Sequence, residues 1–201
     1  DRLPALTQHH SLEQLLHHGD HDLDSNWLRH GCPLRRHQIG AERAGESSLT
    51  SIIAAFGRAY HSKYDTLKIF DDFILKDLIS QKEFSDISEN MIQGIQFFNK
   101  DIALRFQNDP DEIIKWITQV QLSPTPLARA AYCEKVLLNE VMLGLKQYVI
   151  LGAGLDTFCF RHPELKNSLE IFEVDYPATQ DFKKKKLDNA NLKIPSNLHF
   201  V

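Results

Sequence analysis

The stretch Val149-Ile150-Leu151-Gly152-Ala153-Gly154-Leu155-Asp156-Thr157, followed further along by Ile171-Phe172-Glu173-Val174-Asp175, decides the fold. Each part begins with a short apolar run of the kind found in strands buried on both faces. The first run ends in a glycine turn and the second ends in a carboxylate. A strand, a glycine turn and a second strand ending in an acid form the front of a nucleotide-cofactor site in an α/β sheet. We therefore expect a parallel sheet whose first strand runs from Tyr148 to Leu151.

The glycine turn offers two positions without a side chain, and we expect both to lie against a cofactor. Gly152 and Gly154 lack a Cβ atom, so the backbone can turn tightly there and approach a ligand closely. The dinucleotide fingerprint has Gly or Ala at the position where this chain has Thr157, which weakens the case for NAD. The alternative is a structural strand-to-helix turn that binds no ligand.

The acid inside the turn, Asp156, indicates which cofactor binds. A pyrophosphate such as that of NAD is anionic, so a carboxylate at this position would repel it. S-adenosylmethionine has no phosphate and carries an ammonium and a sulfonium. The acidic turn therefore favours S-adenosylmethionine, and the predicted function is that of a methyltransferase. An NAD-type oxidoreductase is the enzymatic alternative.

A second carboxylate, Asp175, follows the second strand about 20 residues after the glycines. At the carboxyl end of that strand it can accept hydrogen bonds from both hydroxyls of a ribose, so we assign it to the cofactor site. The alternative role is a helix N-cap before Pro177. Glu173 points to the same side of the strand. It is the second candidate for the ribose, or a buried acid that needs a partner such as Arg161.

The composition limits the class of protein. Apolar residues make up 42% and charged residues 25% of the chain, which is ordinary for a globular protein, and the net charge is −4. This charge gives no general attraction to nucleic acid or to an anionic membrane, and no apolar run approaches the roughly 20 residues that a spanning helix needs. Three widely spaced cysteines, Cys32, Cys133 and Cys159, are typical of reduced thiols in a cytoplasmic protein.

The chain divides into three parts. Residues 1–44 are rich in His, Asp, Arg and Gly, and we interpret them as a poorly ordered or peripheral extension. Within this part His17 and His21 are four residues apart, but a solvated polar tail explains them better than a metal site. Residues 45–145 carry apolar side chains at helical spacing, which predicts a helical N-terminal layer. Residues 146–201 form the first part of a Rossmann-like cofactor-binding domain.

Local signals predict several features of the helices. Ser47 or Ser48 is the expected N-cap of the first helix, and apolar spacing predicts another over Phe70–Ile79. Before a third helix, Asp109 is the expected cap, Pro110 fits the first helical position, and Glu112 would complete a capping box. The run Lys183–Lys186 lies on a helix after Asp175 and is interpreted as a solvated helix face.

The chain stops within an apolar strand, Leu198–Val201. Three parallel strands make a small sheet for this architecture, and an apolar strand without a successor leaves an unpaired edge. We therefore expect a truncated sheet that belongs to a longer enzyme. The non-enzymatic alternative is a fragment that binds a partner, or itself, through this C-terminal strand edge.

Two motifs resemble those of the leucine carboxyl methyltransferase family: Leu151–Thr157 with Phe160-Arg161 after it, and Phe172–Pro177. The bacterial members of this family include many candidate S-adenosylmethionine-dependent O-methyltransferases, and the resemblance covers about Ser47 to Val201. It implies a Rossmann-like methyltransferase sheet behind an α-helical layer. It also implies O-methylation of a carboxylate or hydroxyl, on a small molecule or a peptide carboxylate.

The resemblance adds one further ligand to the site. An arginine on the helix before the first strand, here Arg129, would pair with the methionyl carboxylate of the cofactor; a solvated helix arginine is the alternative. The chain departs from the family at Phe158, where the family usually has arginine. After the third strand the family places an acid that holds the adenine, and then strands that build the acceptor pocket. The resemblance therefore implies that residues 1–201 without these parts bind the donor weakly or not at all and lack activity. We assign no catalytic base and no metal ligand.

Overall fold

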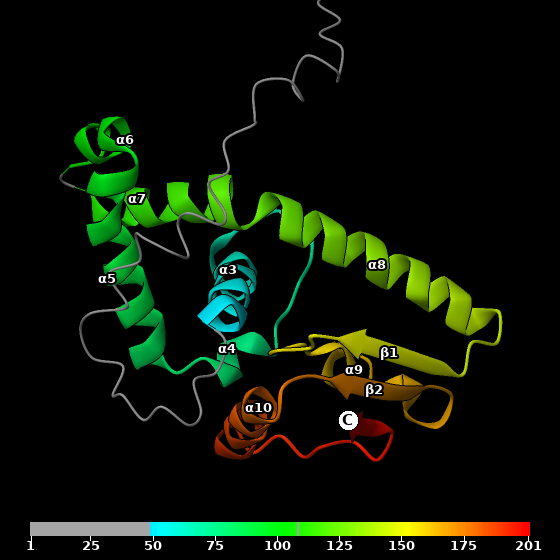
Figure 1. Ribbon diagram of the computed structural model, residues 1–201. Helices are drawn as coiled ribbons and strands as arrows, with labels where there is room; N and C mark the ends of the chain where they lie inside the picture. Colours follow the sequence, from blue (N-terminus) through cyan, green and yellow to red (C-terminus); the bar gives the residue numbers. More distant parts are fainter. Residues whose placement is uncertain (1–48, 108) are drawn as a thin grey trace, which may run out of the picture. The chain divides into compact units, whose positions relative to one another are not determined.

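Three parallel strands form the sheet that carries the glycine turn. The computed structural model describes residues 49–107 and 109–201, which lie within one unit, Gly40–Val201. In it β1 (Gln147–Leu151), β2 (Glu170–Val174) and β3 (Leu198–Phe200) are ordered β1-β2-β3 (Figure 1). Leu151 lies opposite Val174, and Glu173 lies opposite Phe200. The parallel pairing confirms the predicted α/β fold.

Helices precede the sheet and connect its strands. Those before the sheet are α3 (Leu49–Tyr64), α4 (Leu75–Leu78), α5 (Gln81–Phe98), α6 (Lys100–Arg105), α7 (Pro110–Trp116), the π-helical segment η3 (Ile117–Leu122) and α8 (Pro124–Met142). Those between the strands are α9 (Phe158–Arg161), the 3₁₀ segment η4 (Pro163–Asn167) and α10 (Pro177–Asn189). The expectations for residues 1–44 and for a cap at Ser47 or Ser48 lie outside the described residues.

The predicted start of α7 is confirmed in part. The Asp109 carboxylate accepts a hydrogen bond from the Glu112 backbone N–H at 3.1 Å, and Pro110 occupies the first turn. The predicted capping box is wrong, because the Glu112 carboxylate accepts from Lys115 at 3.0 Å instead. A complete capping box occurs at α5, where Ser80 and Glu83 satisfy each other's backbone N–H groups.

The predicted helix over Phe70–Ile79 is wrong. Only Leu75–Leu78 is helical, and the residues before it form bends and turns. Phe70 and Asp72 are both buried in this irregular segment, and the Asp72 carboxylate accepts a hydrogen bond from the Thr157 hydroxyl after β1. Tertiary contacts of this kind override the local apolar spacing.

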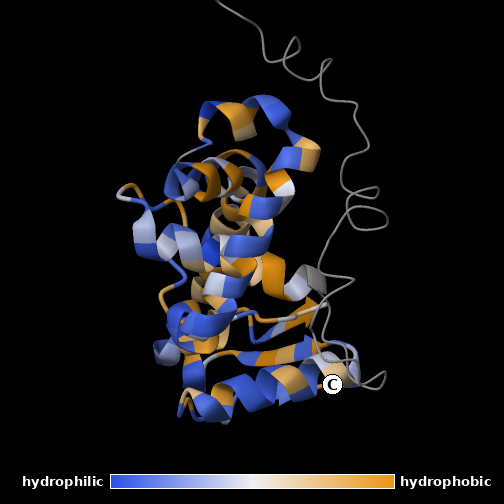
Figure 2. Ribbon diagram, turned by 90° about the vertical axis from the view of Figure 1, so that its left-hand side faces the viewer, coloured by the Kyte–Doolittle hydropathy of each residue, from blue (hydrophilic) through white to orange (hydrophobic). Residues whose placement is uncertain are grey.

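Of the three apolar clusters among the described residues, two hold the glycine turn and the sheet against the helices. In the first, Phe56 on α3 packs with Leu75 on α4, and Leu155 after the glycine turn belongs to the same cluster. In the second, Leu137 on α8 packs with Ile171 on β2. Figure 2 shows, by contrast, that α10 is mostly hydrophilic along its length. The first cluster therefore fixes the glycine turn against the helical layer.

The lysine run on α10 is not the solvated face that the sequence predicts. Lys183 and Lys186 are both buried. The Lys186 ammonium lies 2.7 Å from the Glu83 carboxylate and donates to the Leu78 backbone oxygen at 3.0 Å. The run is wrongly predicted because the partners of Lys186 lie about a hundred residues earlier in the chain and those of Lys183 lie in and before the neighbouring strand β2. A polar helix thus packs against α4 and α5 through charge as well as apolar contact.

Strand β1 is covered on one face, so its predicted burial on both faces is wrong. Tyr148 and Ile150 pack against the cluster that contains Leu137 of α8. On the other face Val149 is 53% exposed and Leu151 is 79% exposed. Helices α8 and α9 lie on the Tyr148 side, and no helix of the described residues covers Val149 and Leu151. None of the described helices is long and apolar enough to cross a lipid bilayer.

One-sided packing of the sheet can be tested by two substitutions. Ile171→Ala should lower the free energy of unfolding by about 2–5 kcal/mol, because Ile171 is fully buried. Val149→Ala, the control on the neighbouring strand, should cost no more than about 1 kcal/mol, because that side chain is half-exposed. Urea denaturation followed by circular dichroism measures both. Equal losses would contradict this packing.

Candidate functional site

The glycine turn leaves β1 with two residues in the left-handed region. Gly152 has φ +67° and Gly154 has φ +53°, values that residues with a Cβ rarely adopt. The Gly152 N–H donates to the Val174 carbonyl at 2.8 Å, so the turn stays attached to the end of β2. Both glycines are thus required by the backbone conformation that brings the turn to the carboxyl ends of the strands.

The two glycines differ in what surrounds them. A Cβ atom on Gly154 would lie 2.6 Å from the Ser51 hydroxyl oxygen on α3, so the helix packs directly on the backbone there. A Cβ atom on Gly152 would meet nothing within 4 Å. The space beside Gly152 is therefore open to a ligand, while Gly154 sets the distance between the turn and α3.

Asp175 and the turn are joined by a direct hydrogen bond. The Gly154 N–H donates to Asp175 Oδ2 at 2.6 Å, and the Tyr176 N–H donates to Oδ1 at 2.7 Å. Each carboxylate oxygen can accept another hydrogen bond, which is what a ribose diol would require. The alternative role as N-cap of α10 does not hold, because the N-cap residue is Tyr176.

Asp156 lies at the start of α9, beside the turn. Its Oδ1 accepts from the Phe158 N–H at 2.8 Å, and its carbonyl oxygen accepts from the Lys183 ammonium at 2.6 Å. The residue is partly exposed. The structure therefore brings together four of the five residues predicted to bind the cofactor: Gly152, Gly154, Asp156 and Asp175.

Arg129, the fifth predicted residue, lies apart from these contacts. It is exposed on α8, and among the described residues no hydrogen bond or ion pair joins it to the other four. The charged contact between α8 and the residues after the turn is made instead by Glu134, beside the apolar packing of Leu137. Its carboxylate accepts two hydrogen bonds from the Arg161 guanidinium, at 2.7 and 2.5 Å.

Glu173 has a different partner from the predicted Arg161. Its Oε2 lies 2.5 Å from the Lys183 ammonium, and each side chain is 1% exposed. Burial raises the pKa of the Glu173 carboxyl above its ordinary value, and the charge of Lys183 opposes that rise. Because Lys183 occupies Oε2 and the side chain is buried, Glu173 is a structural acid beneath the turn rather than a ribose ligand.

Two titratable groups near the turn are held in their neutral forms. Burial, with a smaller effect from the Asp156 charge, raises the pKa of Tyr148 to about 12. Burial and the Glu173 charge raise the pKa of the Cys159 thiol to about 11. Phe158, where the family usually has arginine, is buried and packs edge-on against Tyr148. Neither Tyr148 nor Cys159 is therefore ionised near neutral pH.

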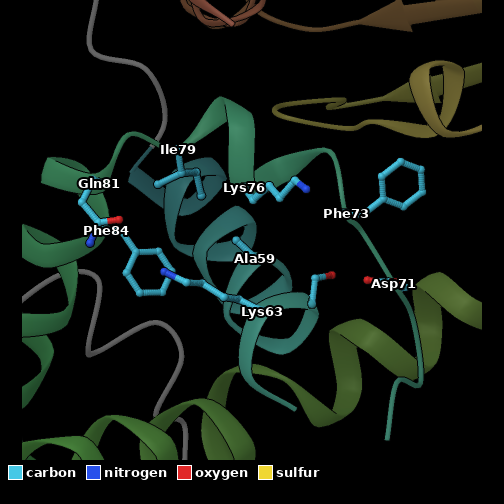
Figure 3. A pocket seen from close by; sticks show the side chains of 9 residues that line it. Ala59, Lys63, Asp71, Phe73, Lys76, Ile79, Gln81 and Phe84 are labelled. Atoms are coloured by element: carbon cyan, nitrogen blue, oxygen red, sulfur yellow. The ribbon is translucent and has the colours of Figure 1, made fainter. Parts of the chain in front are cut away.

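A separate cavity of about 250 Å³ lies in the helical layer (Figure 3). Its lining comes from α3, α4, the start of α5 and the segment that carries Asp71 and Phe73. In Figure 3 the Lys63 side chain extends toward Phe84, while Lys76 points toward Phe73. None of the residues predicted from the sequence to bind the cofactor lines this cavity.

The part of the chain that carries the sheet and the glycine turn also matches a known protein family. Residues 51–201 match the leucine carboxyl methyltransferase family. A Bacillus subtilis (strain 168) protein named "Putative S-adenosyl-L-methionine-dependent methyltransferase YktD" is 74% identical over 159 residues, which are 79% of this chain and 52% of that protein. A protein of Mycobacterium ulcerans (strain Agy99) with the same name, apart from YktD, is 30% identical over 45% of this chain and 28% of its own length. The chain thus spans about half the length of the Bacillus relative.

The buried ion pair beneath the turn can be tested through its pH dependence. Lys183→Met should lower the free energy of unfolding by about 3–5 kcal/mol at pH 7, because it leaves the Glu173 carboxylate buried and unpaired. A raised folded-state pKa means that the folded chain binds the proton more tightly, so this loss should shrink as the pH falls toward 4.5, the ordinary value for Glu173. Urea denaturation between pH 5 and 8 measures the loss.

The control for this substitution is Lys185→Met, an exposed position on the same helix, which should leave stability unchanged. The double variant Glu173→Gln with Lys183→Met should recover part of the loss. A loss that is independent of pH, or an equal loss in the control, would contradict the ion-pair interpretation.

Proposed function

Because the chain belongs to the leucine carboxyl methyltransferase family, we propose that it forms the donor-binding part of an S-adenosylmethionine-dependent methyltransferase. The observation that carries this proposal is the hydrogen bond between the Gly154 N–H and the Asp175 carboxylate. It joins the glycine turn to the acid that follows the second strand, which is the arrangement that α/β sheets use for the ribose end of a cofactor. The names of the relatives support the same activity.

The residues present fit this donor. Open space beside Gly152 gives the ligand access to the backbone of the turn. Asp175 would accept hydrogen bonds from the ribose hydroxyls, and Asp156 would attract the positive charge of the donor. Arg129 remains our proposal for the methionyl carboxylate, on the family resemblance alone. When bound, S-adenosylmethionine supplies an electrophilic methyl group, and the turn orients it.

We propose O-methylation of a carboxylate on a small molecule or a peptide. A carboxylate acceptor is already ionised near neutral pH, so it needs no general base. A hydroxyl acceptor would need one. Tyr148 and Cys159, with pKa values of about 12 and 11, do not supply such a base near the turn. We prefer the carboxylate acceptor because it needs no base from the protein. We place the reaction in the cytoplasm, in keeping with the free thiols Cys133 and Cys159.

Binding of the donor can be measured directly. Isothermal titration calorimetry on the full-length gene product should detect heat when S-adenosylmethionine or its demethylated product is added, and none with NADH, which Asp156 would repel. Asp175→Asn should weaken the binding at least about tenfold, because hydrogen bonds to a charged acceptor are lost.

Glu170→Gln is the matched control for this experiment, since Glu170 is exposed at the opposite end of β2. It should bind S-adenosylmethionine like the unmodified chain. Heat with NADH but not with S-adenosylmethionine would favour the oxidoreductase alternative. An absence of heat with the donor and with its product would contradict the proposed function.

We also propose that the chain self-associates through the edge of β3. This strand pairs with β2, and in the described part of the chain no other strand pairs with it. Size-exclusion chromatography with light scattering should show a mass that rises with protein concentration, because an unpaired edge can add a strand from another chain. A constant monomer mass across the concentration range would contradict this proposal.

A further inference from the structure

The irregular segment of residues 70–73 directs its side chains to two different places. Phe70 lies against the Arg161 guanidinium, whose Cζ is 4.6 Å from the ring centroid, and Asp72 contacts Thr157. Asp71 and Phe73, in contrast, line the cavity of the helical layer (Figure 3). Alternate residues of one segment therefore face the glycine turn and the cavity.

Asp72 is the buried charge of this segment. Its side chain is 0% exposed, and its Oδ1 accepts a hydrogen bond from the Thr157 hydroxyl at 2.5 Å. Two guanidinium groups flank it: Arg58 Nε lies 3.6 Å from Oδ2, and Arg161 Nε lies 3.6 Å from Oδ1. The compensation, which comes from α3 and α9, is partial: Oδ2 and Arg58 Nε have no hydrogen-bond partner among the described residues. Burial raises the pKa of the Asp72 carboxyl above its ordinary value, and the charges of the two arginines oppose that rise.

Each partner of Asp72 also holds the chain that follows the glycine turn. The Arg58 guanidinium donates to the Leu155 carbonyl at 3.0 Å. The Arg161 Nε–H donates to the Thr157 hydroxyl oxygen at 3.0 Å, and the Thr157 carbonyl accepts from the Arg161 N–H at the same distance. The Asp72 carboxylate is thus connected to Leu155 through Arg58, and it contacts Thr157 and Arg161 directly.

The turn needs such support, because its two glycines are the most permissive residues of the backbone. Gly154 is held from one side by Asp175 and faces the Ser51 hydroxyl on the other, which is buried and has no hydrogen-bond partner among the described residues. The other polar side chains that contact residues 155–161 from elsewhere in the described chain are Arg58, Asp72, Glu134, Lys183 and Asn197. Of these, Asp72 contacts two residues of the stretch, Thr157 and Arg161, and each of the others contacts one.

We propose that Asp72 is a positioning residue for the glycine turn, and that its carboxylate holds residues 152–157 in the conformation that binds the donor. It acts through Thr157, Arg58 and Arg161 and touches no donor atom itself. The role in donor binding rests on the proposed function. The role in ordering the turn does not, and it can be measured on the chain alone.

Hydrogen exchange with mass spectrometry tests the ordering of the turn. Asp72→Asn should speed exchange at least about tenfold in peptides that cover residues 152–161, because the charged acceptor of the turn is lost. Peptides from β2 and α5 should exchange as in the unmodified chain. The matched control is Asp71→Asn, one residue earlier and exposed, which should leave the turn unchanged.

A merely structural role for Asp72 would give a different pattern. Exchange would then speed up across α3, α5 and β2 as well as the turn, and that result would overturn the proposal, as would an unchanged turn. If Asp72→Asn does not fold, Thr157→Val removes the hydroxyl that donates to Asp72 and accepts from Arg161 Nε, while both arginines stay beside the Asp72 carboxylate. It should speed exchange about threefold to tenfold at the same residues.

Calorimetry with S-adenosylmethionine separates the two proposals. If the unmodified full-length gene product binds the donor, Asp72→Asn should weaken binding at least about tenfold while Asp71→Asn does not. If the unmodified full-length gene product gives no heat, the proposed function fails, and the exchange measurement alone still decides the positioning role. Full affinity in a folded Asp72→Asn variant would contradict a role in donor binding.

Discussion

Buried carboxylates surround the glycine turn, and the need to compensate each of them governs how the rest of the chain is arranged. Glu173 beneath the turn takes Lys183 from α10, and Asp72 takes Arg58 from α3 and Arg161 from α9. An unpaired charge in such a place would cost several kcal/mol, so these contacts specify which elements pack together. Helix α3, which precedes the glycine turn in the chain, and helices α9 and α10, which follow it, are thereby held against the turn.

The pairing of the buried acids leaves the glycine turn with a negatively charged surface. The buried acids are neutralised by lysine and arginine, while Asp156 and Asp175 stay partly exposed and accept hydrogen bonds from backbone N–H groups. A ligand at the turn therefore meets carboxylates rather than cations. This environment suits a donor with a positive charge and a ribose, and it opposes a pyrophosphate.

The segment of residues 70–73 connects the turn with the helical layer. Asp72 faces the turn, and its neighbours Asp71 and Phe73 wall a cavity on the other side. A helix over this segment would have spread its side chains around an axis. In the irregular backbone alternate residues face two surfaces, with Phe70 and Asp72 toward Arg161 and Thr157 and with Asp71 and Phe73 toward the cavity.

Features that depend on neighbours along the chain could be predicted from the residues alone. Apolar runs specified the strands, glycines at Gly152 and Gly154 specified the turn, and Asp109 with Pro110 specified the start of α7. Gly152, Gly154, Asp156 and Asp175 could be placed at one site because the ends of parallel strands meet at one edge. The tertiary structure decided the burial of Lys183 and Lys186, the partners of Glu173 and Arg161, and the one-sided packing of β1. Those outcomes depend on groups brought together from 10 to 108 positions apart, and the cost of desolvating a charge is fixed by such partners rather than by the local pattern.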